Sequence, residues 1–176
     1  MKFSSQEEYG LRCLLRIARQ GGRASLTIPE ISEAEGLSSF YVAKLMRILR
    51  RAGLVKSARG QIGGYSLSRP PEQIAVGEAL TALGGRLFET DFCTDHTGLE
   101  KTCTSSVDCS IRSLWQAVQN VVDQVLSKTT VTDLLRNEQE MTSLVSPLVQ
   151  ITDGTAKSSE VPTPASLQAH DSDQSD

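Results

Sequence analysis

Apolar residues recur at helical spacing along the first part of the chain. One such run covers residues 5 to about 20 and stops before a pair of glycines. Its apolar members are Tyr9, Cys13, Leu14 and Ile17. A second helix is predicted from Thr27 to Gly36, because Thr27 and Glu30 have the spacing at which two side chains cap each other's backbone amides.

A third amphipathic segment begins at Ser38 or Ser39, either of which can cap a helix, and ends near Gly53. Its apolar residues, at i, i+3, i+4 and i+7, are Val42, Leu45, Met46 and Leu49. The opposite face is polar and basic. Only residues 36–38 separate this helix from the one before it, and that length lets two helices pack as a helix-turn-helix.

Two strand-like runs follow, at residues 54–56 and 65–67. The residues between them include Gly60, Gly63 and Gly64, which turn tightly at low steric cost. The two runs therefore predict a β-hairpin. Helices followed by a hairpin indicate a mainly α fold with a small β-hairpin wing, a winged helix-turn-helix head.

The second half of the chain begins with a short helix predicted over Val76 to Leu83. A polar stretch from about Glu89 to Ser110 follows, and it is longer than connections in compact domains usually are, which indicates a task of its own. The next helix carries a long apolar stripe, formed by Ile111, Leu114, Trp115, Val118, Val122, Val125 and Leu126. Because a head of this size cannot cover that stripe, we expect a second copy of the helix to do so.

These patterns divide the chain into four parts. Residues 1–70 are predicted to form the winged helix-turn-helix domain, 71–110 a connecting helix with a cysteine-bearing loop, and 111–140 the dimerisation helix with a short helix after it. Residues 141–176 are predicted to be disordered, because few large apolar residues occur beyond Gly154.

Charge is divided unequally along the chain. Residues 1–70 carry 12 Lys and Arg against 5 Asp and Glu, a net +7, while residues 71–176 carry 6 against 16, a net −10. A basic head on an acidic remainder indicates a polyanionic partner, such as DNA, for the head alone. No stretch has the apolar length of a membrane span and no secretion signal is recognisable at the start, so we expect a cytoplasmic protein without a membrane partner.

The third helix resembles a recognition helix that binds in the major groove of DNA. Side chains that can contact base edges lie near its start, and cations that can contact phosphates lie further along. A basic tip on the hairpin could enter the adjacent minor groove. The alternative is that single cations such as Arg50, Arg51 and Lys56 only solubilise a basic face. The predicted DNA-contacting residues are Ser38, Ser39, Tyr41, Lys44, Arg47, Arg59 and Gly60.

Three cysteines lie in the polar stretch, Cys93, Cys103 and Cys109, with nine and then five residues between them. Thiolates are soft ligands that suit zinc or an iron–sulfur cluster, and the spacing alone does not choose between the two. Reduced cytosolic thiols argue against a disulfide framework. Cys13 lies on an apolar helical stripe and is expected to be a buried small hydrophobe.

Four sequence motifs accompany the cysteines: MKFSSQEEYGLR at the start, LMRILRRAGLV at the end of the helix pair, SARGQIGGYSLSR in the hairpin and IAVGEAL after it. Over residues 1 to 137 this combination resembles the Rrf2 family of winged-helix transcription regulators, in particular its IscR-, NsrR- and RirA-like iron–sulfur members. The resemblance implies a homodimer joined through the long helix, a palindromic DNA operator, and a cluster on the three cysteines that senses redox state, iron or nitric oxide. It also implies that the state of the cluster changes DNA affinity, and we expect a repressor.

The fourth ligand of the cluster follows only from the resemblance. IscR-like members have a histidine three residues after the third cysteine, where this chain has Arg112. Other members use an acidic residue near the N-terminus of the partner subunit, and Glu8 occupies that place, with His96 as the second candidate. Glu8 favours a [2Fe–2S] over a [4Fe–4S] cluster. In some members the third helix carries a glutamate where this chain has Ala43, so their DNA sequence preference is not transferred.

Three other functions compete with this interpretation. One is a winged-helix regulator that uses a zinc site or a bare thiol switch instead of a cluster. Another is a protein-interaction module on the same scaffold. An enzyme is not expected, because His96 and His170 are the only histidines available as a base for a nucleophilic cysteine and no phosphate-binding loop is present.

Overall fold

The computed structural model describes residues 4–21, 25–58, 63–86 and 108–149. Within these ranges the α-helices are α1 (Ser5–Ala18), α2 (Ile28–Glu35), α3 (Ser39–Arg51), α4 (Val76–Gly84), α6 (Ser110–Lys128) and α7 (Glu138–Val149). The strands are β1 (Val55–Ala58) and β2 (Gly64–Leu67), and short 3-10 turns cover Pro71–Gln73 and Asp133–Leu135. The prediction of a mainly α fold with a β-hairpin wing is confirmed.

The first two helices begin at residues whose side chains cap the free backbone N–H groups of the first turn. The Thr27 side chain accepts a hydrogen bond from the Glu30 backbone N–H at 3.4 Å, and the Glu30 carboxylate accepts one from the Thr27 N–H at 2.7 Å. Ser4 and Glu7 form the same reciprocal pair at the start of α1. At the end of α2, Gly36 has φ +66°, a left-handed conformation that glycine adopts without steric cost.

The hairpin pairs β1 and β2 in antiparallel register, with Val55 opposite Leu67 and Ala58 opposite Gly64. Leu26 extends this pairing, because its backbone exchanges hydrogen bonds of 2.9 and 2.7 Å with Tyr65. The wing is thus attached to the segment that enters α2.

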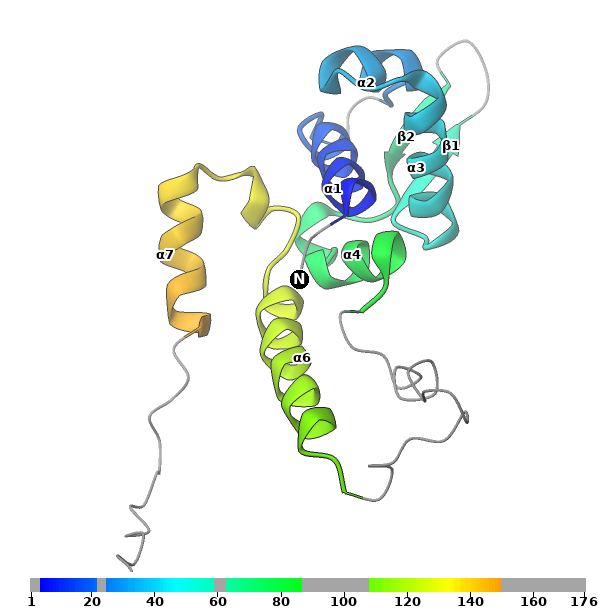
Figure 1. Ribbon diagram of the computed structural model, residues 1–176. Helices are drawn as coiled ribbons and strands as arrows, with labels where there is room; N and C mark the ends of the chain where they lie inside the picture. The colour runs from blue at the N-terminus through cyan, green and yellow to red at the C-terminus, as the bar shows by residue number, and fades with distance from the viewer. Residues whose placement is uncertain (1–3, 22–24, 59–62, 87–107, 150–176) are drawn as a thin grey trace, which may run out of the picture.

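The core of the head lies where α1, α2, α3 and α4 converge beside the hairpin (Figure 1). Its largest side chains are fully buried: Leu14, Ile31, Leu45, Met46, Leu49, Leu54, Ile74 and Leu83. The predicted buried stripe of the third helix is part of this core. Cys13 is also fully buried there, as expected.

Helix α4 is held closely against α1 and α6. A Cβ atom at Gly10 would overlap the Leu83 side chain, so α1 and α4 lie very close together at this point. On the other side, the Val76 N–H donates to the Thr129 carbonyl at 2.8 Å, and the Val131 N–H donates to the Ile74 carbonyl at 2.9 Å. The end of α6 is therefore fastened to the start of α4.

Helix α6 leads away from the head, and α7 lies beside it (Figure 1). The α7 helix extends to Val149, so residues 141–149 are helical although the sequence predicted disorder from residue 141. The reason is an apolar stripe at helical spacing, formed by the half-buried Met141, Leu144, Val145 and Leu148. Residues 150–176, the rest of the predicted tail, lie outside the described residues. None of the helices described is both long enough and apolar enough to cross a membrane.

Candidate functional site

Helix α3 presents one buried and one exposed face. Val42, Leu45, Met46 and Leu49 are buried in the core. Four exposed side chains lie four, three and four residues apart, which places them in one row along the helix: Phe40, Lys44, Arg47 and Arg51. An exposed helix face with three cations suits a polyanionic surface such as the groove of a nucleic acid.

The predicted contact residues of the first turn also take part in the protein's own structure. Ser38 is the N-cap of α3, and its hydroxyl accepts a hydrogen bond from the Tyr41 N–H at 3.3 Å. The Ser39 hydroxyl donates to the Ser32 hydroxyl at 3.2 Å, which joins the start of α3 to α2. These contacts fix how the start of the recognition helix is presented.

Tyr41 connects α3 with α1. Its ring meets the Tyr9 ring edge to face, with centroids 6.1 Å apart. The Arg12 guanidinium lies 5.5 Å from the centroid of Tyr9, and the Lys44 ammonium lies 5.9 Å from the centroid of Tyr41. Two stacked contacts between a cation and a ring thus flank the pair of rings that joins α1 to α3, and each cation–ring contact contributes about 0.5–1 kcal/mol at exposed sites. Tyr41 is half-buried, so its role in packing stands beside the predicted DNA contact.

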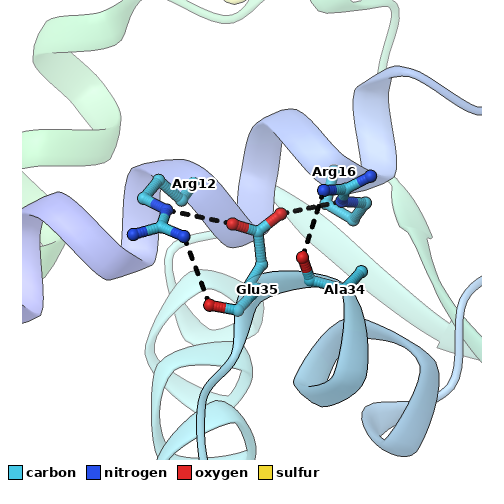
Figure 2. Close-up of polar contacts among 4 residues, drawn as sticks. All are labelled: Arg12, Arg16, Ala34 and Glu35. Carbon is cyan, nitrogen blue, oxygen red and sulfur yellow. Dashed lines mark hydrogen bonds and ion pairs between the residues drawn. The ribbon is translucent and has the colours of Figure 1, made fainter.

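A second connection joins α1 to the end of α2 (Figure 2). The Glu35 carboxylate, whose side chain is only 7% exposed, accepts from Arg12 Nε at 3.0 Å and from Arg16 Nε at 2.7 Å. The same two guanidinium groups donate to the backbone carbonyls of Glu35 and Ala34, at 3.2 and 3.3 Å. The first helix of the helix-turn-helix is thereby fixed before the turn. Local sequence patterns do not reveal this cluster, because Arg16 and Arg12 lie 19 and 23 residues before Glu35.

Phe40 is the second feature that the sequence analysis missed. Its side chain is 84% exposed, the largest exposed fraction among the exposed large apolar residues of the described chain. The signal was present in the periodicity, because Phe40 falls outside the stripe that begins at Val42.

Arg59 and Gly60, the predicted tip of the wing, lie outside the described residues. The strand that leads to them is exposed from Lys56 to Ala58. Arg50 Nη1 donates to the Ser57 hydroxyl at 3.4 Å, which relates the wing to the end of α3. The contacts predicted for Arg59, Gly60, Lys44 and Arg47 with DNA remain predictions.

Among the predicted cluster ligands, Cys109 is described, whereas Cys93, Cys103 and the alternative ligand His96 lie outside the described residues. Cys109 is the N-cap of α6, and its sulfur accepts a hydrogen bond from the Arg112 N–H at 3.4 Å. It is half-exposed. A helix N-terminus is a favourable position for negative charge, so this sulfur is well placed for a ligand role.

Cys13 has the opposite environment. Burial, with a smaller contribution from the nearby Glu35 carboxylate, raises the pKa of Cys13 from 9.0 to about 11, against a lowering effect of Arg12. The thiol therefore stays protonated at neutral pH, and a protonated, buried thiol is a poor metal ligand.

Glu8 and Cys109 stand at different ends of one chain. Glu8 is exposed in the first turn of α1, in the head, and Cys109 caps the start of α6, the end of that helix that lies away from the head (Figure 1). Within residues 4–21, 25–58, 63–86 and 108–149, no three potential ligands of the Cys, His, Asp and Glu types come together. The described part of one chain therefore does not bring Glu8 and Cys109 together in such a group.

The segment with Cys93 and Cys103 is bounded by contacts between α4 and α6. Arg86, just after α4, forms an ion pair with Asp123 in the middle of α6. The buried Gln119 amide donates to the same Asp123 carboxylate at 2.7 Å. A small cleft of about 30 Å³ lies at this junction, between the first turn of α1 and the packed helices, with Glu7, Arg86, Gln119 and Asp123 in its wall.

Comparison with known proteins places these features in a family. The family model of the Rrf2 iron-dependent transcriptional regulators matches residues 3–137. The HTH-type transcriptional regulator CymR of Bacillus subtilis is 32% identical over 134 residues, which cover 76% of this chain and 89% of CymR.

Two solved structures are similar as well. The structure of T. potens IscR matches with a TM-score of 0.60 at 32% identity, over 77% of this chain and 86% of that protein. The oxidized form of Staphylococcus aureus CymR matches with a TM-score of 0.58 at 30% identity, over 78% of this chain and 98% of that protein. These relatives are named as regulators of transcription rather than as enzymes.

Proposed function

Because this chain belongs to the Rrf2 family of transcriptional regulators, we propose that it is a homodimeric DNA-binding repressor whose affinity for DNA depends on an iron–sulfur cluster. The observation that carries the proposal is the position of the cysteines: their segment connects α4 with α6, and its last member, Cys109, caps α6. A change at the cysteines acts directly on the two helices that support the head.

The DNA-binding part of the proposal rests on α3. Three of its exposed cations, Lys44, Arg47 and Arg51, lie on the face opposite the core, and the hairpin lies beside the end of the helix. In such heads the start of the recognition helix meets base edges while cations contact phosphates. Ser38, Ser39, Tyr41, Lys44, Arg47, Arg59 and Gly60 are the residues proposed to contact DNA.

Dimerisation is supported by the surface of α6. Ile111, Leu114, Trp115 and Val121 are 61, 58, 40 and 40% exposed. Such a row of apolar side chains is stabilised by a partner that removes it from water. A second copy of α6 provides a matching apolar surface, and a two-fold dimer then presents its two heads to a palindromic operator.

The proposed cluster ligands are Cys93, Cys103 and Cys109 of one subunit and Glu8 of the other. The described members fit this role, because the Cys109 sulfur is accessible at a helix N-terminus and the Glu8 carboxylate is exposed. Three thiolates and one carboxylate complete the four ligands of a [2Fe–2S] cluster. When bound, the cluster would supply a centre sensitive to oxidants, iron supply and nitric oxide.

The packing offers a route from the cysteines to the DNA-reading helix. Helix α6 packs on α4, and α4 packs on both α1 and α3. The Arg86–Asp123 ion pair and the backbone bonds of Val76 fasten the α4–α6 junction. Two recognition helices must stand about 34–36 Å apart to enter successive major grooves, so a small rotation of α6 is enough to weaken binding.

The cluster is tested by purification without oxygen. The proposal predicts a coloured protein that contains iron and acid-labile sulfide, and spectra that report a [2Fe–2S] cluster. Cys103→Ala should lose iron and sulfide, whereas the matched control Cys13→Ala should keep both, because Cys13 is buried in the head. Equal iron and sulfide content in the two variants would refute the assignment of ligands.

A second candidate is a regulator that uses a zinc site or a thiol switch without iron. The similarity to CymR, for which an oxidized form has been solved, favours this alternative. A colourless protein with stoichiometric zinc, or a metal-free protein whose DNA binding changes on thiol oxidation, would select it. Metal analysis and thiol titration of the same preparation separate the candidates.

DNA binding itself is tested through its salt dependence. Log affinity should fall by about 0.9 per neutralised phosphate for each tenfold rise in salt. Arg59→Ala should weaken binding to an A/T-containing operator if the wing enters the minor groove. Retention on DNA that is insensitive to salt would favour a protein-interaction module instead.

A further inference from the structure

We propose that Phe40 determines part of the DNA sequence preference by contacting the C5-methyl group of a thymine in each half of the operator. The inference rests on the proposed DNA-binding function and deepens it. It concerns a residue outside the predicted set of contacts, and it assigns a base rather than a phosphate.

The first observation is the position and exposure of Phe40. It is the second residue of α3, in the turn where a recognition helix comes nearest to the bases. Its side chain is 84% exposed, while Val42, two residues on, is fully buried. The ring therefore projects from the start of the helix and contributes little to the core.

The second observation is the surroundings of the ring. Lys44, Arg47 and Arg51 continue the row that Phe40 begins, so the ring lies at one end of a cationic helix face. Phosphates attract the three cations, and their contact brings the first turn of α3 towards the floor of the major groove. The other exposed large apolar side chains of the described residues, Ile111, Leu114, Trp115 and Val121, all belong to α6. A surface with one apolar ring among several cations is better suited to bind a polyanion than to bind the apolar surface of another protein.

The third observation concerns the polar groups next to Phe40. The Ser38 hydroxyl accepts from the Tyr41 N–H, and the Ser39 hydroxyl donates to Ser32. The Tyr41 ring packs against Tyr9. Three of the first four side chains at this end of α3 are thus engaged within the protein, and Phe40 is the one that extends outward.

The chemistry of the ring then selects the base. A phenyl group neither donates nor accepts a conventional hydrogen bond, so it cannot read the donor and acceptor pattern of a base edge. In the major groove, thymine is the one base that offers an apolar group, its C5-methyl, and phenylalanine is among the side chains that contact it. A thymine is therefore the base that Phe40 recognises.

The test replaces single thymines by deoxyuridine, which removes the methyl group and keeps all base-pairing groups. The probe is a duplex selected by the full-length protein from a random-sequence library. For the wild-type protein, one deoxyuridine substitution in each half-site removes two methyl groups from the duplex and should lower affinity about fifteenfold, about fourfold for each methyl group removed from a dry contact. For Phe40→Ala, the same substitution should change affinity by less than twofold.

Arg51→Ala is the matched control on the same face. It should lower affinity for thymine- and deoxyuridine-containing duplexes equally and reduce the salt slope by about one. Far-UV circular dichroism should show that both variants are folded, since neither side chain is buried.

The outcomes separate the inference from the function on which it rests. If the wild-type protein binds its selected duplex but no deoxyuridine substitution weakens it, or if Phe40→Ala keeps the same sensitivity, the inference is wrong and DNA binding stands. If the wild-type protein selects no duplex, the proposed function itself fails.

Discussion

The head and the helix α6 bury their apolar side chains in opposite ways. In the head, α1 to α4 enclose Leu14, Leu45 and Met46 completely, within a single chain. In α6, Ile111 and Leu114 remain about 60% exposed in the described chain. The core of the head is therefore complete in one copy, whereas α6 keeps exposed apolar side chains for which a partner surface is proposed. Sensing and dimerisation are proposed for the part that is incomplete.

The largest effect is expected at the exposed surface of α6. Leu114→Glu should place a carboxylate in the proposed dimer contact and weaken dimerisation by about 4 kcal/mol, roughly a thousandfold. Sedimentation velocity over a series of concentrations measures this change. Asn120→Glu, on the polar side of the same helix, should leave the dimer intact. Indistinguishable oligomeric states for the two variants would show that this surface is not the interface.

The head should respond differently, because its core needs no partner. Leu45→Ala, at a fully buried position, should lower the free energy of unfolding by about 3 kcal/mol, within the range of about 2–5 kcal/mol for leucine cavities. Urea unfolding in the Leu114→Glu background keeps dimerisation out of the measurement. Phe40→Ala on the same helix should change stability by less than about 0.5 kcal/mol. A large loss in the control would mean that the exposed ring is part of the fold.

The buried cysteine of the head, Cys13, provides a further test of its closed core. Because burial raises the pKa of Cys13 to about 11, the folded head prefers the protonated thiol. The resulting stabilisation is fully present below pH 9, the unfolded value, and is lost as the pH rises towards 11. The loss should reach at most about 2–3 kcal/mol. Urea titrations at pH 8 and pH 10.5 measure it, and Cys13→Ala should remove the extra slope. An unchanged slope in that variant would assign it to other groups.

The smallest effect is expected where α1 meets α2. Arg16→Ala should destabilise the head by about 1–2 kcal/mol, because the Glu35 carboxylate, 7% exposed, would lose a charged donor. Thermal unfolding measures the loss. Arg19→Ala, exposed at the end of α1, should change stability by less than about 0.5 kcal/mol. Equal losses in both variants would indicate a general effect of charge rather than the Glu35 contact.

Much of the head could be predicted from the sequence because its signals are local. The capping pair of Thr27 and Glu30 fixed the start of α2, and the spacing of Val42, Leu45 and Leu49 marked the buried face of α3. Contacts between distant segments could not be predicted this way. The Glu35 cluster depends on how α1 and α2 pack, and local periodicity carries no information about that packing.

The later part of the chain shows where local signals fail. The stripe of Met141, Leu144 and Leu148 was overlooked because Thr142, two serines and Pro147 lie between its members, so residues 141–149 of α7 were predicted as part of a disordered tail. The predicted site is only partly described. Cys109 caps α6, and Glu8, on α1, is proposed to reach the site from a second copy of the chain. The other two cysteines lie outside the described residues.

The most direct measurement compares the DNA affinity of one preparation with and without its iron. Full-length protein is purified without oxygen, and half of it is depleted of iron by chelation under the same conditions. The account predicts that affinity for the selected duplex differs by at least about tenfold between the two halves, and that Cys103→Ala behaves like the depleted half throughout. Equal affinities for an iron-containing and an iron-depleted protein would contradict the claim that the cysteine segment controls the head.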